Sequence, residues 1–445
     1  MFKTLKTAWG IPEIRKKMLF TLFIIVIFRL GGAITVPFLD TEAINTWMTE
    51  KASNGNFLEY LNILSGGALA KATIFSLGVT PFINASIIIQ LLTYALPPLE
   101  RLQQEGEDGR KKLNQISSFV ALGLAAFMSV AYYLTLKNGG NAVKYTPSKD
   151  GATGWFAMFV IIGCFMAGAS LVIWMGNRIN EKGIGNGVSM ILFAGIVARI
   201  PIDIGTLGGL VLNDPKKYFL TVVIYLLIFV AMVVLIVFFN EAERRIPVQY
   251  AKRVVGRKQY GGQNTHIPIK VCMSGVMPII FAMSFMSLPS MFTMFWEPVK
   301  YIDETTTGGQ KFYYYFTKFF STQSYSYALV YFILIILFNY FYVAITYNPV
   351  EMANNLRQSN GGIPGIRPGK PTSDYIQRVL SKISLVGAVF LGLVAVFPII
   401  FLKITNINVS SMGGTSVLIV VSVAIETVRT LESQLMMRHH PGFLK

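Results

Sequence analysis

The chain has 445 residues, of which 53% are hydrophobic and only 14% are charged, and its formal net charge is +17. Because soluble domains carry about 25% charged residues, this composition excludes an ordinary water-soluble globular protein. The apolar residues gather in runs of roughly 17–25, the length that crosses about 30 Å of hydrocarbon as a helix. We therefore predict an all-α membrane protein.

The apolar runs predict ten membrane-spanning helices. The first run follows a basic stretch but has no clear small-residue cleavage site, so we expect a retained helix rather than a signal peptide. The fifth run is short and rich in glycine, and it is the weakest candidate. The predicted spans are residues 18–38, 74–96, 116–136, 154–175, 185–201, 216–239, 271–295, 325–347, 383–403 and 411–431.

The charges orient these spans. With the N-terminus in the cytosol, most of the 39 lysines and arginines fall in cytosolic segments, as the positive-inside rule describes for short loops. An even number of spans then places both termini in the cytosol. Two long cytosolic loops, at about 240–270 and about 348–382, should project from the membrane as tips. The turn formers between Gly361 and Pro371 exclude a helix there.

The second apolar region is interrupted by residues that a plain membrane anchor does not need, namely Gly66, Gly67, Lys71, Asn84 and Gln90. In lipid, irregular and polar backbone is tolerated only where it lines a cavity or packs inside a bundle. One helix face cannot easily hide both Asn84 and Gln90, which are six residues apart. This spacing favours a seam that can open, although hydrogen bonding between helices is the plainer alternative.

The sequence has no motif for catalysis or metal binding. The two cysteines, Cys164 and Cys272, lie in or at the edge of different spans, and the three histidines lack metal-ligand spacing. The nearest approach to a phosphate loop, Gly365–Lys370, is followed by Pro371 where Ser or Thr should stand. We therefore expect no enzyme and no cofactor. Arg29 is the main ionisable residue well within a span, and structural and functional roles for it are equally open.

Basic residues are denser in the loop at about 240–270 than orientation alone requires. Lys252 and Arg253 are followed closely by Arg257 and Lys258. Topology remains a simpler explanation for such a run. We favour the docking of an acidic partner or of a phosphate backbone such as ribosomal RNA.

Seven stretches together resemble the signatures of the SecY family, whose members form the central channel of the bacterial protein-translocation machinery. Each stretch alone is a moderate signal, but they occur in order, and the similarity runs from about Ile14 to the end of the last span. The stretches are Ser65–Ala68, Thr80–Leu92, Gly183–Gly187, Glu243–Arg253, Thr265–Lys270, Ile363–Gly369 and Gly413–Val421.

The resemblance implies ten helices in two pseudo-symmetric halves of five around a central hourglass pore. Residues 1–205 would form the N-terminal half and residues 206–445 the C-terminal half. A short plug helix at about residues 62–75 would fill the outer funnel of the pore. The plug would include Ser65, Gly66, Gly67 and Lys71.

The resemblance also implies a constriction made of aliphatic side chains and a lateral gate. Aliphatic groups close around a passing chain without hydrogen-bonding to it, and a narrow apolar neck resists wetting. Ordinary core packing is the alternative for these positions. The gate would lie between spans two and three on one side and seven and eight on the other, flanked by Asn84 and Gln90. The constriction positions are Val79, Ile83, Val188, Leu192, Ile280 and Ile419.

The function implied is that of a protein-conducting channel of a bacterial plasma membrane, which passes unfolded secretory chains across and releases apolar segments sideways. Its implied partners are SecE, SecG, the motor ATPase SecA, the ribosome, polypeptides that carry signal sequences, and lipid. A secondary transporter with a midplane site is the alternative, and the lack of buried acids argues against it. The positions implied to dock SecA or the ribosome are Lys252, Arg253, Arg257, Lys258 and Arg367.

Overall fold

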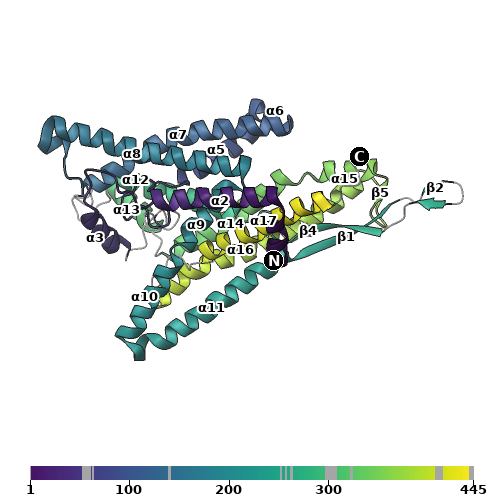
Figure 1. Ribbon diagram of the computed structural model, residues 1–445. Helices are drawn as coiled ribbons and strands as arrows, with labels where there is room; N and C mark the ends of the chain where they lie inside the picture. Colours follow the sequence, from purple (N-terminus) through teal and green to yellow (C-terminus); the bar gives the residue numbers. More distant parts are fainter. Residues whose placement is uncertain are drawn as a thin grey trace.

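A computed structural model shows an elongated bundle of helices with a small β-sheet at one end (Figure 1). We call the end that carries the strands β1 (Glu243–Tyr250) and β4 (Asn264–Lys270) the sheet end. The helices α3 (Thr41–Ala52) and α13 (Gly308–Phe319) lie at the opposite end. The structure describes residues 2–52, 62, 65–138, 142–250, 253–255, 258–260, 264–295, 308–320, 324–405 and 414–439.

Helices dominate the chain, as predicted. The further helices are α1 (Phe2–Gly10), α2 (Pro12–Gly31), α5 (Thr80–Ala95), α6 (Pro97–Gln104), α7 (Glu107–Asn138), α8 (Pro147–Lys182), α9 (Gly187–Val197), α10 (Ile200–Asn213), α11 (Pro215–Glu241), α12 (Met277–Phe295), α14 (Tyr325–Thr346), α15 (Pro349–Gln358), α16 (Lys370–Thr405) and α17 (Gly414–His439). The further strands are β2 (Arg253–Val255), β3 (Lys258–Tyr260) and β5 (Gly361–Gly362).

A helix lies at each of the ten predicted spans, which confirms the helical membrane class, while the number of membrane crossings stays a prediction. Within the described residues, six helical stretches are long and apolar enough to cross a membrane by themselves. The pair α5 and α6, bent by 106° at the break, makes a seventh if it is counted as one span. The fifth predicted span is longer than expected, because α9 and α10 together form one apolar stretch over Gly187–Asn213.

Helix boundaries differ from the prediction on both sides of the predicted plug, at the end of α2 and at the start of α5. The helix α2 ends at Gly31, where the N–H of Gly32 donates to the Phe28 carbonyl at 3.0 Å, so residues 32–38 are not helical. The helix α5 begins at Thr80 with Pro81 in its first turn, a position where the missing N–H of proline costs nothing. Residues 65–79, which we call the turn segment, therefore precede the helix instead of belonging to it.

The two predicted loops form one substructure at the sheet end, which the sequence did not predict. Strand β1 pairs antiparallel with β4 on one edge and with β5 on the other, where Gln249 lies opposite Gly362. Ile246 and Val248, two residues apart on one face of β1, are buried against residues of α15 and α16. Both loops thus share a small apolar core of their own.

The main core runs through the middle of the bundle. Its buried side chains come from α2, α5, α8, α9, α11, α12, α14, α16 and α17. A second core at the opposite end joins Leu69, Ala72 and Leu77 of the turn segment to α3, α7 and α8. The helices fall into two groups, one from the first half of the chain (α2 to α10) and one from the second (α11 to α17). The groups meet where α12 contacts α5 and α7 and where α17 contacts α9.

Candidate functional site

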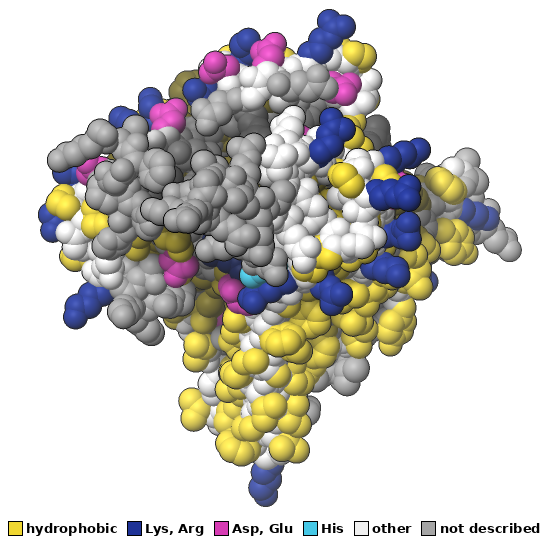
Figure 2. Space-filling view, turned by 90° about the vertical axis from the view of Figure 1, so that its right-hand side faces the viewer, with side chains coloured by type: hydrophobic (Ala, Val, Ile, Leu, Met, Phe, Trp, Pro, Cys, Tyr) yellow, Lys and Arg dark blue, Asp and Glu magenta, His cyan; other side chains and the backbone are white. Residues whose placement is uncertain are grey.

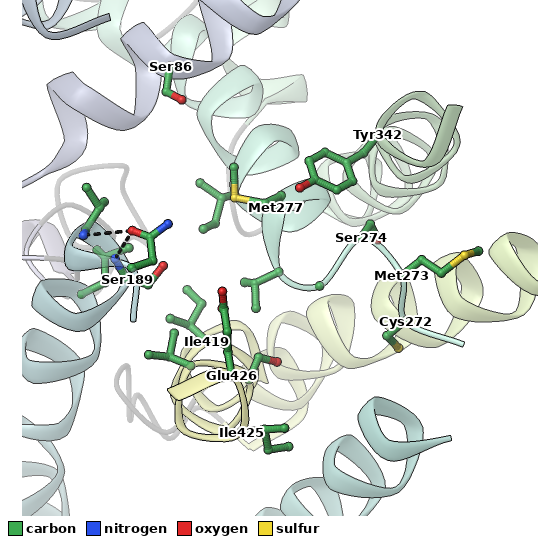
Figure 3. A pocket seen from close by; sticks show the side chains of 18 of the residues that line it. Ser86, Ser189, Cys272, Met273, Ser274, Met277, Tyr342, Ile419, Ile425 and Glu426 are labelled. Carbon is green, nitrogen blue, oxygen red and sulfur yellow. Dashed lines mark hydrogen bonds between the residues drawn. The ribbon is translucent and has the colours of Figure 1, made fainter. Parts of the chain in front are cut away.

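A cavity of about 890 Å³ lies inside the bundle, between the sheet end and its middle (Figure 3). Its wall is contributed by α5, α7, α8 and α9 from the first half of the chain and by α11, β4, α12, α14 and α17 from the second. Pro268 and Lys270 of β4 mark its side toward the sheet end, together with Arg429 of α17. The cavity therefore lies between elements that the sequence keeps far apart.

Polar side chains line much of the cavity, and several of them fix its shape. Asn186 caps α9 by accepting hydrogen bonds from the N–H groups of Val188 at 3.1 Å and Ser189 at 3.4 Å. Gly187 donates its N–H to Asn180 at 2.7 Å. A Cβ on Gly187 would come within 2.0 Å of the Gly176 carbonyl, so α9 starts in backbone contact with α8.

The charged residues of the cavity gather toward the sheet end. Arg429 donates to Glu241 at 2.9 Å and to the carbonyl of Asn240 at 3.2 Å, which joins α17 to the end of α11. Burial lowers the pKa of Lys270, and the positive charge of Arg429 lowers it further, against the opposing effect of nearby carboxylates. Glu426 also lines the cavity. Among the described residues, no three His, Cys, Asp or Glu side chains gather as a metal site would need.

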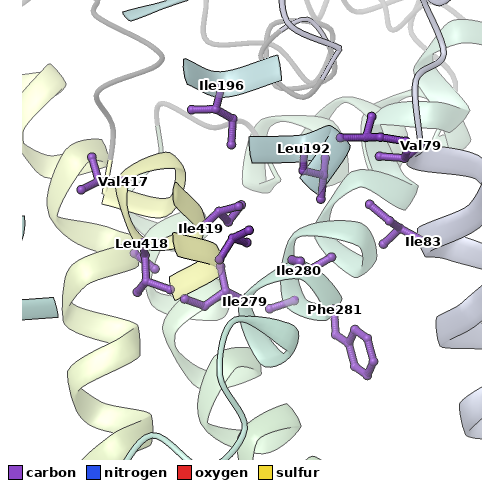
Figure 4. Packing of buried hydrophobic residues seen from close by; sticks show 14 of the residues in the cluster. Val79, Ile83, Leu192, Ile196, Ile279, Ile280, Phe281, Val417, Leu418 and Ile419 are labelled. Atoms are coloured by element: carbon purple, nitrogen blue, oxygen red, sulfur yellow. The ribbon is translucent and has the colours of Figure 1, made fainter. Parts of the chain in front are cut away.

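Buried aliphatic side chains of the main core border the cavity (Figure 4), and we call the six predicted constriction residues among them the neck. The structure brings all six predicted constriction residues into one apolar cluster. Five of them are between 2% and 8% exposed, and Val188 packs against them while partly exposed. All except Val79 also line the cavity. The members are Val79, Ile83, Val188, Leu192, Ile280 and Ile419.

Other residues of this cluster were missed by the sequence analysis. Ile196 follows Val188 and Leu192 at the same four-residue spacing along α9, so helical periodicity could have found it. Phe281 packs edge-on against Phe338 of α14, with ring centroids 5.9 Å apart. It has no comparable sequence signal, because an aromatic residue in an apolar run is ordinary.

The turn segment covers the neck from the opposite end. Residues 65–75 form successive turns, where the resemblance implied a short plug helix. Of the preceding residues 62–64, only Asn62 is described, and it is helical. Gly66 and Gly67 have positive φ angles, +68° and +88°, which side-chain-bearing residues rarely adopt. Ser65 is buried, whereas Lys71 is exposed.

The position of Arg29 bears on whether this residue has a structural or a functional role, which the sequence left open. A Cβ on Gly66 would lie 2.6 Å from a guanidinium nitrogen of Arg29 and 3.0 Å from the Cα of Gly195. Gly66 thus fits between the Arg29 side chain and the backbone of α9. The Arg29 side chain is half-buried, and its guanidinium lies against the turn segment.

The seam between the two groups of helices is closed. Near the end of α5, the Tyr94 ring packs edge-on against Phe341 of α14, with centroids 5.9 Å apart. A hydrogen bond joins the side chains of Tyr94 and Gln103, which lies on the bent-back helix α6. Of the two predicted gate residues, Gln90 lines the cavity, while the Oδ1 atom of Asn84 is buried without a hydrogen-bond partner in the described structure.

A buried polar network joins elements inside the second half. Asn339 of α14 donates to the Ser384 carbonyl of α16 at 3.0 Å and accepts a short hydrogen bond from Ser274. The network joins the segment before α12 to two neighbouring helices of this half.

Three of the predicted docking residues, Arg253, Lys258 and Arg367, lie at the sheet end, where Lys and Arg side chains are prominent (Figure 2). Arg367 is exposed, and its carbonyl accepts a hydrogen bond from Thr372 at 2.8 Å. Arg253 and Lys258 belong to the hairpin of β2 and β3, opposite Tyr260 and Val255. Only their backbone is described, and the remaining two candidates, Lys252 and Arg257, lie outside the described residues.

Comparison with known proteins agrees with this geometry. The SecY family model matches residues 73–428. Protein translocase subunits SecY from Mycobacterium bovis and Streptomyces coelicolor are 40% and 39% identical, over 97% and 100% of both chains.

Solved structures share the fold across 99% of both chains. A protein-conducting channel is 16% identical with a TM-score of 0.63, and a SecY structure that concerns the plug domain is 17% identical with a TM-score of 0.65. Sec61 in a canine ribosome–channel complex is 16% identical with a TM-score of 0.60. The family model covers most of the chain and the relatives match it from end to end, so the chain belongs to the SecY family.

Proposed function

We propose that this chain is the protein-conducting channel of a translocase in the plasma membrane of a bacterium. It passes unfolded secretory polypeptides across the membrane and releases apolar segments sideways into lipid. The observation that supports the proposal is the cavity bordered by clustered aliphatic side chains, with the turn segment packed against the same cluster. A transporter with a midplane site is not favoured, because the charged residues of the cavity lie toward the sheet end.

The neck suits a passage for chains of any sequence. Ile83, Leu192 and Ile280 present only methyl groups and methylenes, which make no hydrogen bonds that a moving backbone must break. The polar cavity before it keeps an unfolded chain hydrated until it reaches the constriction. We assign the six clustered aliphatic residues to this constriction.

The seam provides the sideways exit. Parting α5 and α7 from α12 and α14 would separate Tyr94 from Phe341 and open the bundle to lipid. Asn84 supports this assignment, because a buried amide oxygen without a partner disfavours the closed packing around it. Gln90, on the cavity wall, would meet a signal sequence that enters the seam.

The sheet end is the docking surface for a motor or a ribosome. Arg367 is held between Pro364 and Pro368, and its guanidinium offers a planar fork of donors to carboxylate or phosphate. The hairpin that carries Arg253 and Lys258 extends beyond strands β1 and β5 (Figure 1). SecA would supply the energy of transport, the ribosome would dock there during synthesis, and SecE and SecG would brace the helices in the membrane.

We place the sheet end in the cytosol. Ala8 and Ile14 near the start of the described chain pack against Leu431 and Leu435 near its end. The two ends therefore lie on one side, which agrees with the prediction that both termini are cytosolic. A cysteine at Ser359 should then react with an impermeant thiol reagent only in inverted vesicles. A cysteine at Lys144 should react in intact cells, and the reverse pattern would refute the orientation.

Cross-linking to an arrested substrate tests the function itself. A precursor halted by a folded C-terminal domain, carrying a cysteine in its threaded part, should form disulfide bonds with cysteines at Leu192 and Ile419 when an oxidant is added. The control is Leu227, which lies on α11 and is 68% exposed. Equal cross-linking at Leu227, or none at the two neck positions, would show that the chain does not pass through the neck.

A further inference from the structure

The second part of the turn segment, residues 68–77, which we call the collar, is bound to the chain that follows α2. The N–H of Val36 donates to the carbonyl of Ala72, and the N–H of Ile74 donates to the carbonyl of Ile34, both at 3.0 Å. Thr35 and Thr73 form an antiparallel bridge between these two bonds. A short piece of sheet therefore attaches the collar to the end of the first long helix.

A tyrosine of α7 holds the collar from another side. The hydroxyl of Tyr132 donates to the carbonyl of Leu69 at 2.8 Å. Tyr132 is 3% exposed and Leu69 is fully buried, so water cannot replace this bond. The Tyr132 ring packs against Phe165 of α8, with centroids 5.0 Å apart, which fixes the direction of the hydroxyl.

Two glycines let helix backbones approach the collar closely. A Cβ on Gly168 of α8 would come within 1.9 Å of the Ile74 carbonyl. A Cβ on Gly31 would overlap the Phe75 ring, which also stacks on Phe28 with centroids 5.8 Å apart. The collar is thus enclosed by α2, α7 and α8.

The residues before the collar are held differently. In the described part of the chain, Ser65 and Gly67 form hydrogen bonds only with Asn62 or with other residues of the turn segment. One of them runs from the Gly67 N–H to the Asn62 carbonyl at 2.7 Å. Gly66 contacts the Arg29 side chain and the backbone at Gly195. Moving residues 65–67 away from the neck would therefore break few bonds to the rest of the bundle.

We propose that the turn segment is divided at Ala68 and that Tyr132 is the positioning residue that anchors its fixed part. This inference rests on the proposed function, because it assigns the mobile part of the plug to residues 65–67. The collar stays in place when the channel opens. Since it runs directly into Val79 and α5, it also keeps that side of the neck aligned.

The chain offers a matched pair of variants for the test. Tyr132→Phe removes only the anchoring hydroxyl, whereas Tyr133→Phe removes a neighbouring buried hydroxyl that has no hydrogen-bond partner in the described structure. In liposomes that contain the purified complex, Tyr132→Phe should raise the resting ion leak about threefold to tenfold. Loss of one buried hydrogen bond increases the population in which the collar is displaced and no longer keeps Val79 aligned in the neck. Tyr133→Phe should leave the leak unchanged. Equal leaks in the two variants would refute the role of Tyr132.

A disulfide tests the division independently of any effect on folding. In the double variant Thr35→Cys/Thr73→Cys, oxidation would lock the collar to the chain after α2. The oxidised channel should translocate a precursor as fast as the reduced channel, because the collar does not move. If oxidation blocks translocation, the whole segment moves and the inference is wrong. If the reduced and unmodified channels also fail to translocate, the proposed function fails instead.

Discussion

The two sides of the neck are built in opposite ways. Toward the sheet end, Ile83, Leu192 and Ile280 border a cavity of about 890 Å³ with a polar wall. Toward the opposite end, Val79 is continuous with the collar, in which Leu69, Ala72 and Leu77 are buried against neighbouring helices. One side is an open space that is already formed, and the other is filled by buried side chains.

This difference determines where the channel must change shape. A polypeptide can reach the neck from the sheet end without rearrangement, because the cavity needs no opening step. It can leave only after the residues packed on the other side, or those along the seam, have moved. We therefore expect variants on the cavity side to alter the delivery of substrates, and variants of the neck and seam to alter the closed state.

The largest effect is expected from Arg367→Glu on the docking surface. Reversal of this exposed charge would replace the proposed charge-assisted bond to a docked partner with repulsion, and one such bond contributes about 1.5–3 kcal/mol. Translocation driven by SecA should fall more than about tenfold, while assembly with SecE and the resting leak stay normal.

The exposed Arg357, in α15 of the same loop, supplies the control for that variant. Arg357→Glu makes the same change of charge and should reduce translocation much less. Normal translocation by Arg367→Glu at limiting SecA would remove Arg367 from the docking site. A raised leak in that variant would contradict the separation of the two sides.

The next effect is expected in the neck itself. Ile419→Asn replaces a side chain that is 3% exposed with an amide that water can hydrate. Part of the roughly 1.5–3 kcal/mol gained by burying isoleucine should be lost from the closed state. A bias of about 1–2 kcal/mol would raise the open population about five- to thirtyfold.

Two measurements in reconstituted membranes check this prediction. The ion leak without substrate should rise, and precursors with defective signal sequences should pass. Ile419→Val keeps the position apolar and should change neither. Normal assembly of Ile419→Asn with unchanged conductance and unchanged signal stringency would exclude Ile419 from the constriction.

What the sequence could predict depends on how local the signal is. Long apolar runs predict helices, and the spacing of Val188 and Leu192 places both on one face of α9, because each signal lies within one element. The pairing of Gln249 with Gly362 could not be predicted, because it depends on two loops meeting in space. The buried pair Ile246 and Val248 was an available sign of a strand.

The conformation of the turn segment could not be predicted, because it depends on residues that lie far away in the sequence. Its glycines indicated an irregular backbone, but the collar conformation depends on Tyr132 and Gly168, which lie on other helices. In the sequence, Tyr132 is one aromatic residue in an apolar run. Arg29 was visible as an unusual charge, yet only the fold shows that it lies against Gly66.

A moderate effect is expected at the seam. Edge-to-face aromatic pairs contribute about 0.5–1.5 kcal/mol beyond the area that they bury. Tyr94→Ala and Phe341→Ala should therefore each increase the passage of precursors with defective signal sequences about two- to tenfold. The double variant should show no larger increase than either single variant. Tyr94→Phe keeps the ring and should stay close to the unmodified channel. Additive effects in the double variant would show that the two rings are not coupled.

The smallest effect is expected from the ion pair at the edge of the cavity. Arg429 and Glu241 lie 2.9 Å apart with side chains 32% and 57% exposed, and solvent screens such pairs. Glu241→Gln should lower the free energy of unfolding by less than about 1 kcal/mol, and salt should shrink the difference. Translocation should not change if the cavity is a preformed space, because the Asn240 carbonyl still accepts a bond from Arg429. A clear loss of translocation without a loss of stability would mean that the cavity side also changes shape during transport, and the contrast between the two sides of the neck would then fail.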